Sequence, residues 1–229
     1  MKRFLTTTTA LAAIFAFTNS ASAADPIDYS HDWSGFYGGI FGGYAFGDWS
    51  AKGDFDEGPP DTKFKLSPDG GVLGLTIGHN WQTDQLVLGI ESELGYNSAN
   101  DKRFVVPSPD NFGKVNYGMY GTLAGRFGYA FDNTLLFAKA GGVIADINNR
   151  GGDLDGGAID PTDFAQNKKA SFGLLVGAGA EYAVNENWSI KAEYDFMAFE
   201  NKKDVNQDGD LYKFRNQLHV IKVGVNFNF

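Results

Sequence analysis

The chain contains no cysteine among its 229 residues, so no disulfide can hold its fold together. Basic residues are scarce as well: 19 Lys and Arg stand against 28 Asp and Glu, for a formal net charge of −9. A surplus of acidic side chains argues against nucleic acid as a partner. Beyond the first 23 residues no apolar run approaches the ~20 residues that a membrane-spanning helix needs. These absences exclude a disulfide-stapled domain, a nucleic-acid-binding protein and a helical membrane protein.

The first residues have the pattern of a secretory signal peptide. Lys2 and Arg3 supply its positive segment, Leu11–Phe17 lie in its apolar segment, and Ala21-Ser22-Ala23 fits its A-x-A cleavage site. We therefore expect two parts: a cleaved signal peptide, residues 1–23, and one exported domain, residues 24–229. Without the two cations of the signal, 17 basic side chains face 28 acidic ones, a net charge near −11.

Glycine and aromatic residues are abundant, with 30 Gly, 20 Phe, 10 Tyr and 4 Trp, and they occur in the alternating runs that strands favour. The last nine residues, Ile221–Phe229, alternate without interruption between apolar and polar or small side chains. A strand places successive side chains on opposite faces, and no helical period follows the signal peptide. The period of two predicts eight strands, at about Trp33–Trp49, Gly71–Gln82, Leu86–Asn97, Val115–Phe131, Leu135–Ile147, Ala170–Val184, Trp188–Phe199 and Leu218–Phe229.

The connections between these strands alternate in length. Three are tight and consist of turn-forming residues: Thr83-Asp84-Gln85, Asp132-Asn133-Thr134 and Asn185-Glu186-Asn187. Four are long and polar, at roughly residues 50–70, 98–114, 148–169 and 200–217. Short turns at one end, long loops at the other and an even strand count are typical of outer-membrane barrels. We therefore predict an all-β fold: an eight-stranded antiparallel up-and-down transmembrane barrel with short periplasmic turns and four long extracellular loops.

One face of each predicted strand is apolar, and this face can meet either lipid or a soluble core. In 188–199 the apolar face includes Trp188, Ile190 and Tyr194, and the other face carries Lys191 and Glu193. A soluble barrel would turn a densely charged face outward, whereas the polar faces here are mostly Gly, Ala, Ser and Asn, which suits a narrow interior. Aromatic residues also collect at strand ends, as interfacial girdles do: Trp81, Tyr129, Phe131, Trp188, Phe227 and Phe229 near the turns, and Trp49, Tyr96 and Tyr117 near the loops. We therefore expect the apolar faces to meet lipid.

The opposite faces then place charged residues inside the barrel. Five are acidic and four are basic: Glu91, Glu93, Arg126, Lys139, Glu181, Lys191, Glu193, Asp195 and Lys222. Buried charges must be paired, because their desolvation is otherwise not offset. This near-balanced set predicts a network of salt bridges that plugs the lumen, with an ion pathway or proton relay as the alternative. Glu193 and Asp195 also resemble a catalytic carboxylate pair, but no nucleophile or cleft accompanies them, so we expect no enzyme.

One loop contains the opening of a calcium-binding pattern, D-x-N-x-D-G-D. Its candidate ligands are Asp204, Asn206, Asp208 and Asp210. The twelfth position, where a calcium loop needs a bidentate Glu, is Arg215. An acidic, flexible surface loop is therefore the preferred interpretation, with weak Ca²⁺ binding as the alternative, and we expect no cofactor. The histidines, His31, His79 and His219, lie in separate segments without metal-ligand spacing.

The segment Asp32–Tyr44, DWSGFYGGIFGGY, resembles the opening strand of small α-proteobacterial outer-membrane proteins. These are the porin-like major surface antigens of Rhizobiales, including Brucella and Rhizobium, with the pattern W-x-G-F/Y-Y-x-G followed by G-G-Y. The terminal Val223–Phe229 is similar to their closing strand. The resemblance implies a monomeric eight-stranded barrel, often associated with lipopolysaccharide and important for envelope integrity and host contact. It also implies that the barrel-assembly machinery recognises Phe229. Some relatives are described as haemin-binding, a property for which this sequence offers no residue set.

We therefore expect an integral protein of the cell outer membrane with a structural and surface role. Its partners would be outer-membrane lipid, lipopolysaccharide and, during biogenesis, the assembly machinery. The first alternative is a narrow porin or transporter for ions or small solutes, although eight strands leave little open lumen. The second is a module whose loops bind Ca²⁺, haemin or a host factor.

Overall fold

The computed structural model describes residues 31–53, 62–104, 111–155, 158–167, 170–205 and 211–229. The predicted signal peptide, residues 1–23, lies outside the described residues. Eight long strands form the wall of a barrel: β1 (Gly35–Gly53), β3 (Asp69–Thr83), β4 (Leu86–Asn97), β6 (Asn111–Phe131), β7 (Thr134–Asp155), β9 (Ala170–Ala183), β10 (Trp188–Phe199) and β12 (Leu211–Asn228). Each pairs antiparallel with its neighbours in the chain, and β1 pairs with β12, which closes the barrel. No helix long and apolar enough to cross a membrane occurs among the described residues.

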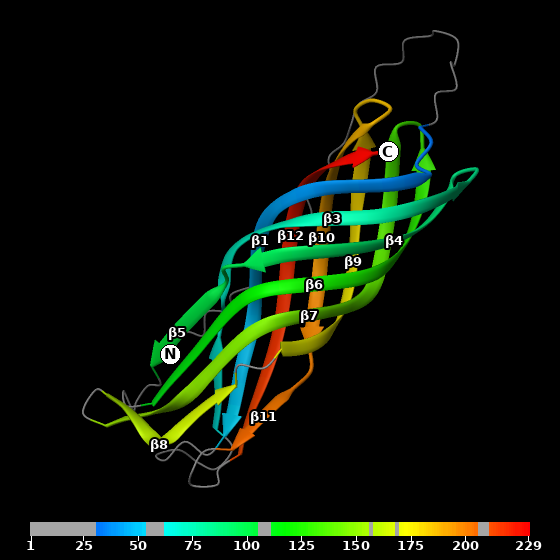
Figure 1. Cartoon of the computed structure of the whole chain (residues 1–229). Coiled ribbons are helices and arrows are strands. Elements are labelled where there is room, and N and C mark those ends of the chain that lie inside the picture. Colours follow the sequence, from blue (N-terminus) through cyan, green and yellow to red (C-terminus); the bar gives the residue numbers. More distant parts are fainter. Residues whose placement is uncertain (1–30, 54–61, 105–110, 156–157, 168–169, 206–210) are drawn as a thin grey trace, which may run out of the picture.

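The predicted eight-stranded antiparallel barrel is confirmed, and its two ends differ as expected. At one end, here the turn end, β3 and β4 are separated by two residues, and so are β6 and β7. Asp84 and Asp132 have φ of 53° and 49°, the left-handed conformation that tight hairpin turns require and that Asp tolerates. The C-terminus lies at this end (Figure 1). In outer-membrane barrels the turn end faces the periplasm.

The other end, here the loop end, contains more strand than the sequence predicts. β1 continues to Gly53 and β7 to Asp155, while β6 begins at Asn111 and β12 at Leu211. Four short strands pair with these extensions: β2 (Thr62–Leu66) with β1, β5 (Asn100–Phe104) with β6, β8 (Ala158–Asn167) with β7 and β11 (Lys202–Val205) with β12. Figure 1 shows β5, β8 and β11 projecting together beyond the wall. The outer faces of these extensions stand in water and need not be apolar, so the alternation that predicts strands fades there.

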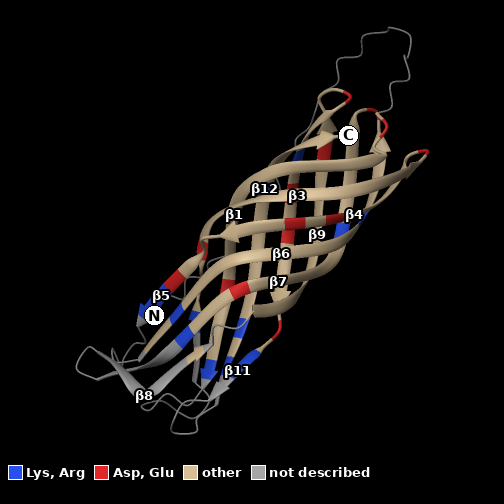
Figure 2. Cartoon of the chain, viewed as in Figure 1, with Lys and Arg blue, Asp and Glu red and all other residues tan. Residues whose placement is uncertain are grey.

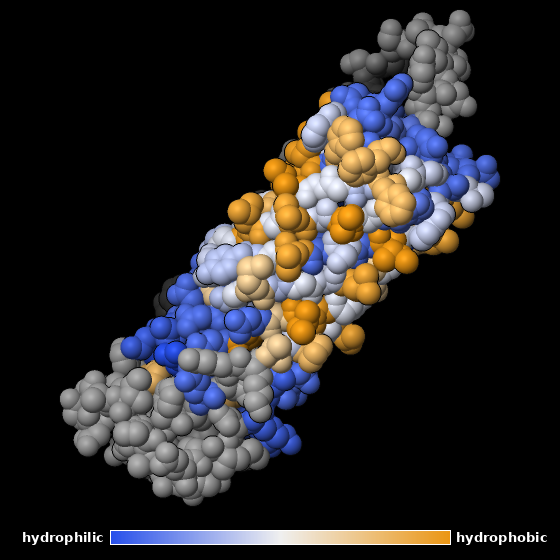
Figure 3. Space-filling model, viewed as in Figure 1, coloured by the Kyte–Doolittle hydropathy of each residue, from blue (hydrophilic) through white to orange (hydrophobic). Residues whose placement is uncertain are grey.

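The apolar faces point outward, as predicted. On β10, Trp188 and Ile190 are 47 % and 48 % exposed, whereas Lys191 and Glu193 are 2 % and 4 % exposed. Figure 3 shows hydrophobic side chains over the middle of the visible face and hydrophilic ones toward both ends. A soluble barrel would have the reverse arrangement, with charges outside and apolar groups within. The outer wall is therefore built to contact lipid.

Two residues that we expected in the outer aromatic girdle lie inside instead. Trp49 is 1 % exposed, because it continues the inward series of β1 that includes Tyr37 and Phe41, and its Nε1 donates a hydrogen bond to Asn149 Oδ1 at 2.7 Å. Tyr117 is 6 % exposed. A β-bulge between Tyr117 and Tyr120 shifts the pairing of β6 with β7, and such a bulge reverses which residues face inward. The prediction for both residues was wrong, and the other expected loop-end aromatic, Tyr96, is 53 % exposed.

Candidate functional site: the charged lumen

The inward positions of six strands bring the predicted charged residues together. The structure places all nine inside the barrel, each at most 4 % exposed: Glu91 and Glu93 on β4, Arg126 on β6, Lys139 on β7, Glu181 on β9, Lys191, Glu193 and Asp195 on β10, and Lys222 on β12. Strand pairing sets some of them directly opposite one another. Arg126 faces Lys139, Lys191 faces Glu181, and Glu193 faces Lys222.

Lys139 is the centre of this network. Its Nζ lies 2.9 Å from Glu91, 3.1 Å from Glu93, 2.5 Å from Glu193 and 3.5 Å from Asp195. These carboxylates belong to β4 and β10, which are not neighbours in the wall, so Lys139 links strands across the lumen. One ammonium group therefore connects three strands.

Two further lysines complete the central cluster from β10 and β12. Lys222 Nζ lies 2.7 Å from Glu93, 3.0 Å from Glu193 and 2.7 Å from Asp195. Lys191 Nζ lies 2.8 Å from Glu91 and 3.2 Å from Glu193. Each lysine therefore contacts more than one carboxylate, and each contacts Glu193. Such shared pairing offsets the desolvation of the charges better than isolated pairs would.

Arg126 forms a second centre, toward the turn end. Its guanidinium pairs with Glu181, lies 3.9 Å from the centroid of the Phe137 ring and donates to Tyr37 Oη at 3.3 Å. Tyr37 Oη in turn donates to Glu91 Oε2 at 2.9 Å, which joins the two centres. Glu181 Oε1 accepts hydrogen bonds from Ser189 Oγ and Asn226 Nδ2, both at 2.6 Å.

The uncharged members of the network were not among the predicted site residues. Tyr37, Ser189 and Asn226 are all buried, and all share inward faces with neighbouring charged or small residues. Their position in the alternation identifies them, because residues an even number apart lie on the same face of a strand. Ser189 and Asn226 share the inward face with Lys191 and Lys222, and Tyr37 shares it with Trp33. Polar residues at inward positions next to charges therefore belong to the same network.

Glycines on the inner face leave room for the large side chains of the lumen. A Cβ added at Gly78 would lie 2.4 Å from Tyr37 Cζ, and one added at Gly95 would lie 2.7 Å from Tyr120 Cε1. At Gly74 an added Cβ would lie 2.4 Å from Phe41 Cζ. Real Cβ atoms do not approach so closely, so the rings occupy the volume that these residues leave empty. Glycines on the inner face thus allow large aromatic side chains to fill the lumen.

Apolar side chains close the lumen on both sides of the charges. Toward the turn end lies a cluster of five buried residues: Trp33, Val87, Ala130, Leu135 and Ala183. Toward the loop end lies a larger cluster that includes Trp49, Leu66, Ile147 and Phe214. Trp49 and Phe214, whose ring centroids are 5.8 Å apart, lie in this layer above the ion pairs. The interior therefore consists of an apolar layer, a charged layer and a second, mostly apolar layer.

Among the described residues, Glu91, Glu93 and Glu193 form a carboxylate group whose oxygens, one from each residue, lie within 4.8 Å of one another. Oxygen ligands suit Ca²⁺ and Mg²⁺. Here, however, Lys139, Lys191 and Lys222 already place three ammonium groups against these oxygens. The lysines supply the positive charge that a metal ion would otherwise provide, so the donor set does not fit a resident metal.

The predicted calcium motif falls largely outside the described residues. Asn206, Asp208 and Asp210 lie outside the described residues. Asp204 lies in β11, where it pairs with Tyr212. The histidines lie in different places. His219 Nδ1 is 2.6 Å from Tyr194 Oη and its ring stacks on Phe46, whereas His79 packs against aromatic rings nearer the turn end.

Comparison with known proteins matches this architecture. A family model described as "Outer membrane protein beta-barrel domain" matches residues 9–229. The 31 kDa outer-membrane immunogenic protein of Brucella melitensis biotype 1 is 29 % identical over 229 residues, which cover 97 % of this chain and 94 % of that protein. The 22 kDa outer membrane protein of Rhizobium leguminosarum bv. viciae is 28 % identical over 204 residues, covering 89 % and 82 % of the two chains.

Solved structures that are similar to this one include two outer-membrane barrels. Neisserial surface protein A is 19 % identical with a TM-score of 0.43, covering 86 % of this chain and 98 % of that one. OprG of Pseudomonas aeruginosa is 14 % identical with a TM-score of 0.49, covering 88 % and 99 %. The family match extends over nearly the whole sequence, and the barrel has an outward apolar wall. The chain therefore belongs to the outer membrane protein β-barrel family and is a protein of the cell outer membrane.

Proposed function

We propose that the protein is a structural component of the outer membrane, a barrel with a filled lumen that strengthens the envelope and presents its loop end at the cell surface. The observation that carries this proposal is the charged lumen, whose nine members are at most 4 % exposed. An eight-stranded barrel is only wide enough for side chains to fill. Ion pairs between apolar layers favour a solid interior over a path for ions or solutes.

The energetics favour the same role. Opening a path along the axis requires Lys139 to leave four carboxylates on β4 and β10. Removal of one partner from a buried ion pair typically costs about 3–5 kcal/mol. A conformation in which several of these pairs are broken would therefore be rarely populated. A narrow porin or transporter is thus the weaker candidate.

The proposed role includes neither catalysis nor oligomerisation. A catalytic carboxylate pair must be reachable by a substrate, and Glu193 and Asp195 are 4 % and 0 % exposed. The 31 kDa relative from Brucella is named an outer-membrane immunogenic protein. The pairing of β1 with β12 leaves the barrel wall without a free edge that could recruit a second chain, which supports a monomer.

Phe229 is proposed as the signal that the barrel-assembly machinery recognises. It is 80 % exposed and lies at the turn end, where its backbone N–H donates to Phe36 O at 3.0 Å. This hydrogen bond attaches the last residue to β1 and leaves the ring accessible from outside. An exposed terminal aromatic group on the closing strand is a suitable recognition element.

Conductance of the refolded full-length chain in a planar lipid bilayer tests the proposal. We expect no steady channels, because the lumen is filled by paired charges. Heat-denatured protein serves as the control for leakage caused by detergent. Steady channels that disappear when Lys191 or Arg126 is replaced would assign a transport role to the lumen and refute the structural one.

A further inference from the structure

The buried charges of the lumen do not balance. Among the described residues, the buried charged side chains are five carboxylates and four cations, each at most 4 % exposed. Figure 2 shows acidic segments on β4 midway along the barrel, well apart from the basic residues gathered at the loop end. An uncompensated charge in a protein interior is costly, because water cannot solvate it. The lumen therefore requires one further positive charge.

The excess of negative charge lies on the side of the network nearer the loop end. Two pairs are complete: Arg126 pairs with Glu181, and Lys191 Nζ lies 2.8 Å from Glu91. Two lysines then remain for three carboxylates. These five residues are Lys139 and Lys222 with Glu93, Glu193 and Asp195.

Asp195 is the least compensated of these three carboxylates. Its ion pairs with described residues use only Oδ2, which lies 2.7 Å from Lys222 Nζ and 3.5 Å from Lys139 Nζ. Glu93 accepts hydrogen bonds from Lys222 through both oxygens, each at 2.7 Å, and Glu193 contacts three lysines. In the described part of the chain, Asp195 Oδ1 has no hydrogen-bond partner. Half of this carboxyl group is therefore buried without a partner.

Oδ1 of Asp195 lies at the boundary between the charged layer and the apolar layer of the loop end. Gly177 is directly opposite Asp195 on β9, and a Cβ added there would overlap Oδ1, so this oxygen lies against the glycine. On the other side, β12 places Val220 opposite Asp195. Leu175 and Met197, one inward position nearer the loop end, are 1 % and 2 % exposed. An ionised Oδ1 would thus be a bare charge beside apolar groups.

The ionisable groups that face Asp195 come from five strands. They are Glu93 on β4, Tyr120 on β6, Lys139 on β7, Glu193 on β10 and Lys222 on β12. At this level β9 contributes Gly177, which has no ionisable group. Two ammonium groups thus serve three carboxyl groups, and a phenol adds no positive charge. Carboxyl groups that share a site do not all ionise readily, because their charges repel one another.

A proton supplies the missing charge better than a metal ion does. A hard metal cation needs several oxygen ligands, and lysines already contact the oxygens of Glu93 and Glu193. A proton needs a single oxygen, and Oδ1 of Asp195 is available for it.

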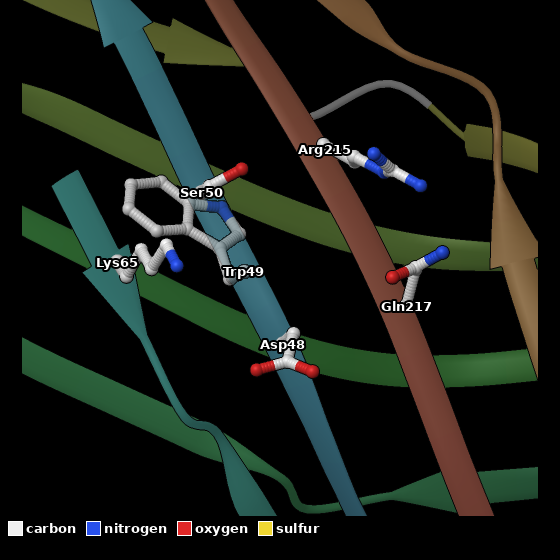
Figure 4. A pocket seen from close by; sticks show the side chains of 6 residues that line it. All are labelled: Asp48, Trp49, Ser50, Lys65, Arg215 and Gln217. Atoms are coloured by element: carbon white, nitrogen blue, oxygen red, sulfur yellow. The ribbon is translucent and has the colours of Figure 1, made fainter. Parts of the chain in front are cut away.

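The charged layer is also separate from the pocket at the loop end. This pocket has a volume of about 210 Å³ and is lined by Asp48, Trp49, Ser50, Lys65, Arg215 and Gln217. Figure 4 shows that these residues come from strands that run side by side, with Lys65 on one side of β1 and Arg215 on the other. The lining includes Trp49 of the apolar layer but none of the nine lumen charges. The pocket therefore stops short of Asp195.

We propose that the lumen holds one resident proton, bound to Asp195 and taken up from water when the barrel folds. The network then consists of four carboxylates, four cations and one neutral carboxylic acid. The inference deepens the proposed function and rests on it, since it requires a filled lumen that excludes water. Loss of the proton would leave a negative charge beside an apolar layer, so the interior is neutral only while the proton stays.

The pH dependence of unfolding tests the inference. Refolded full-length wild type, Asp195→Asn and the control Glu181→Gln are unfolded by denaturant in lipid vesicles, from about pH 5 to about pH 8. An unfolded Asp is ionised above about pH 3.9, so the folded wild type would bind one proton more than the unfolded chain. Relative to Asp195→Asn, the folding equilibrium constant of the wild type should then fall by up to about tenfold for each pH unit, until the folded protein loses the proton. Relative to Glu181→Gln, which changes the separate centre at Arg126, it should stay constant.

Infrared spectroscopy of the folded protein at neutral pH gives a second measurement. A neutral carboxylic acid has a C=O stretching band above those of carboxylates and amides, and exposed Asp and Glu are ionised at this pH. We expect the band in the wild type and in Glu181→Gln, and its absence from Asp195→Asn. A difference in gel mobility between boiled and unboiled samples shows that each variant has folded.

Several results would overturn the inference. Absence of the acid band from the wild type, or a stability relative to Asp195→Asn that does not change with pH, would refute the bound proton. A band that remained in Asp195→Asn would place the proton on another group. Stability that followed the concentration of Na⁺ or K⁺ instead of pH would assign the missing charge to a metal cation. The conductance experiment is separate: channels in a wild type that keeps the acid band would refute the structural role alone, whereas a closed barrel without the band would refute the proton alone.

Discussion

The inside and the outer wall of this barrel use the same residue types for opposite purposes. Lys139 is 4 % exposed and contacts four carboxylates, whereas Lys213, on the outer wall, is exposed and pairs with no described carboxylate. Inside, water cannot solvate a charge, so every lysine needs a partner. Outside, water solvates the charge, so no partner is required. The comparison teaches that the environment of a charge, rather than its presence, decides whether the charge must be paired.

The largest difference between the two regions should appear when a lysine is replaced in each. Lys139→Met leaves Glu91, Glu93, Glu193 and Asp195 without their shared cation, and we expect the free energy of unfolding to fall by about 3–5 kcal/mol. Lys213→Met changes an exposed side chain and should alter it by less than about 0.5 kcal/mol. Denaturant unfolding of refolded protein in lipid vesicles measures both. Similar losses for the two variants would contradict the assignment of Lys139 as the centre of the network.

A smaller contrast concerns glycines on the two faces. Gly74→Ala places a Cβ 2.4 Å from Phe41 Cζ and 2.7 Å from Leu94 O, so ring and backbone must both move. We expect a loss of about 1–3 kcal/mol, as in other overpacked interiors. Gly42→Ala points outward, where the nearest atom is 3.8 Å away, and should have little effect.

The same unfolding assay compares the two glycine variants, and a gel of unboiled samples reports whether each barrel has closed. An unchanged stability for Gly74→Ala would mean that the lumen is looser than the distances indicate. A large loss for Gly42→Ala would mean that the outer wall tolerates no additional volume.

The sequence predicts the inner face better than the pairing within it. Alternation assigns a side of the wall to every residue of a regular strand, and the structure places all nine predicted charges inside. Which carboxylate contacts which cation depends on how far neighbouring strands are shifted relative to one another. The alternation of side chains within one strand carries no information about this shift. The contact of Lys139 with Glu193, on two strands that β9 separates, could not be predicted for this reason.

The errors have physical causes of the same kind. Tyr117 lies beyond a bulge, and one extra residue transfers a side chain to the other face. Trp49 lies inside because the loop-end extension of the barrel has an apolar layer of its own. The prediction assumed that aromatic residues near the strand ends contact the membrane interface, and so it did not anticipate this layer. The strand extensions to Gly53 and Asp155 were missed because neither of their faces meets lipid.

The smallest expected effect is the pH dependence of a charge at the loop end. A hydrogen bond from Lys202 Nζ, followed by one from the Phe172 backbone N–H, lowers the pKa of the Glu200 carboxyl below its usual value. A carboxyl whose pKa is lower in the folded state stabilises the fold above its unfolded pKa, about 4.3, and this contribution is lost as the pH falls through the folded value. Glu200 is exposed, so salt should screen the effect. We expect the difference in stability between wild type and Glu200→Gln to be larger at pH 7 than at pH 3, and to shrink in high salt. A difference that instead grew on acidification would reverse the sign of the pKa shift and show that the pair with Lys202 is not formed in solution.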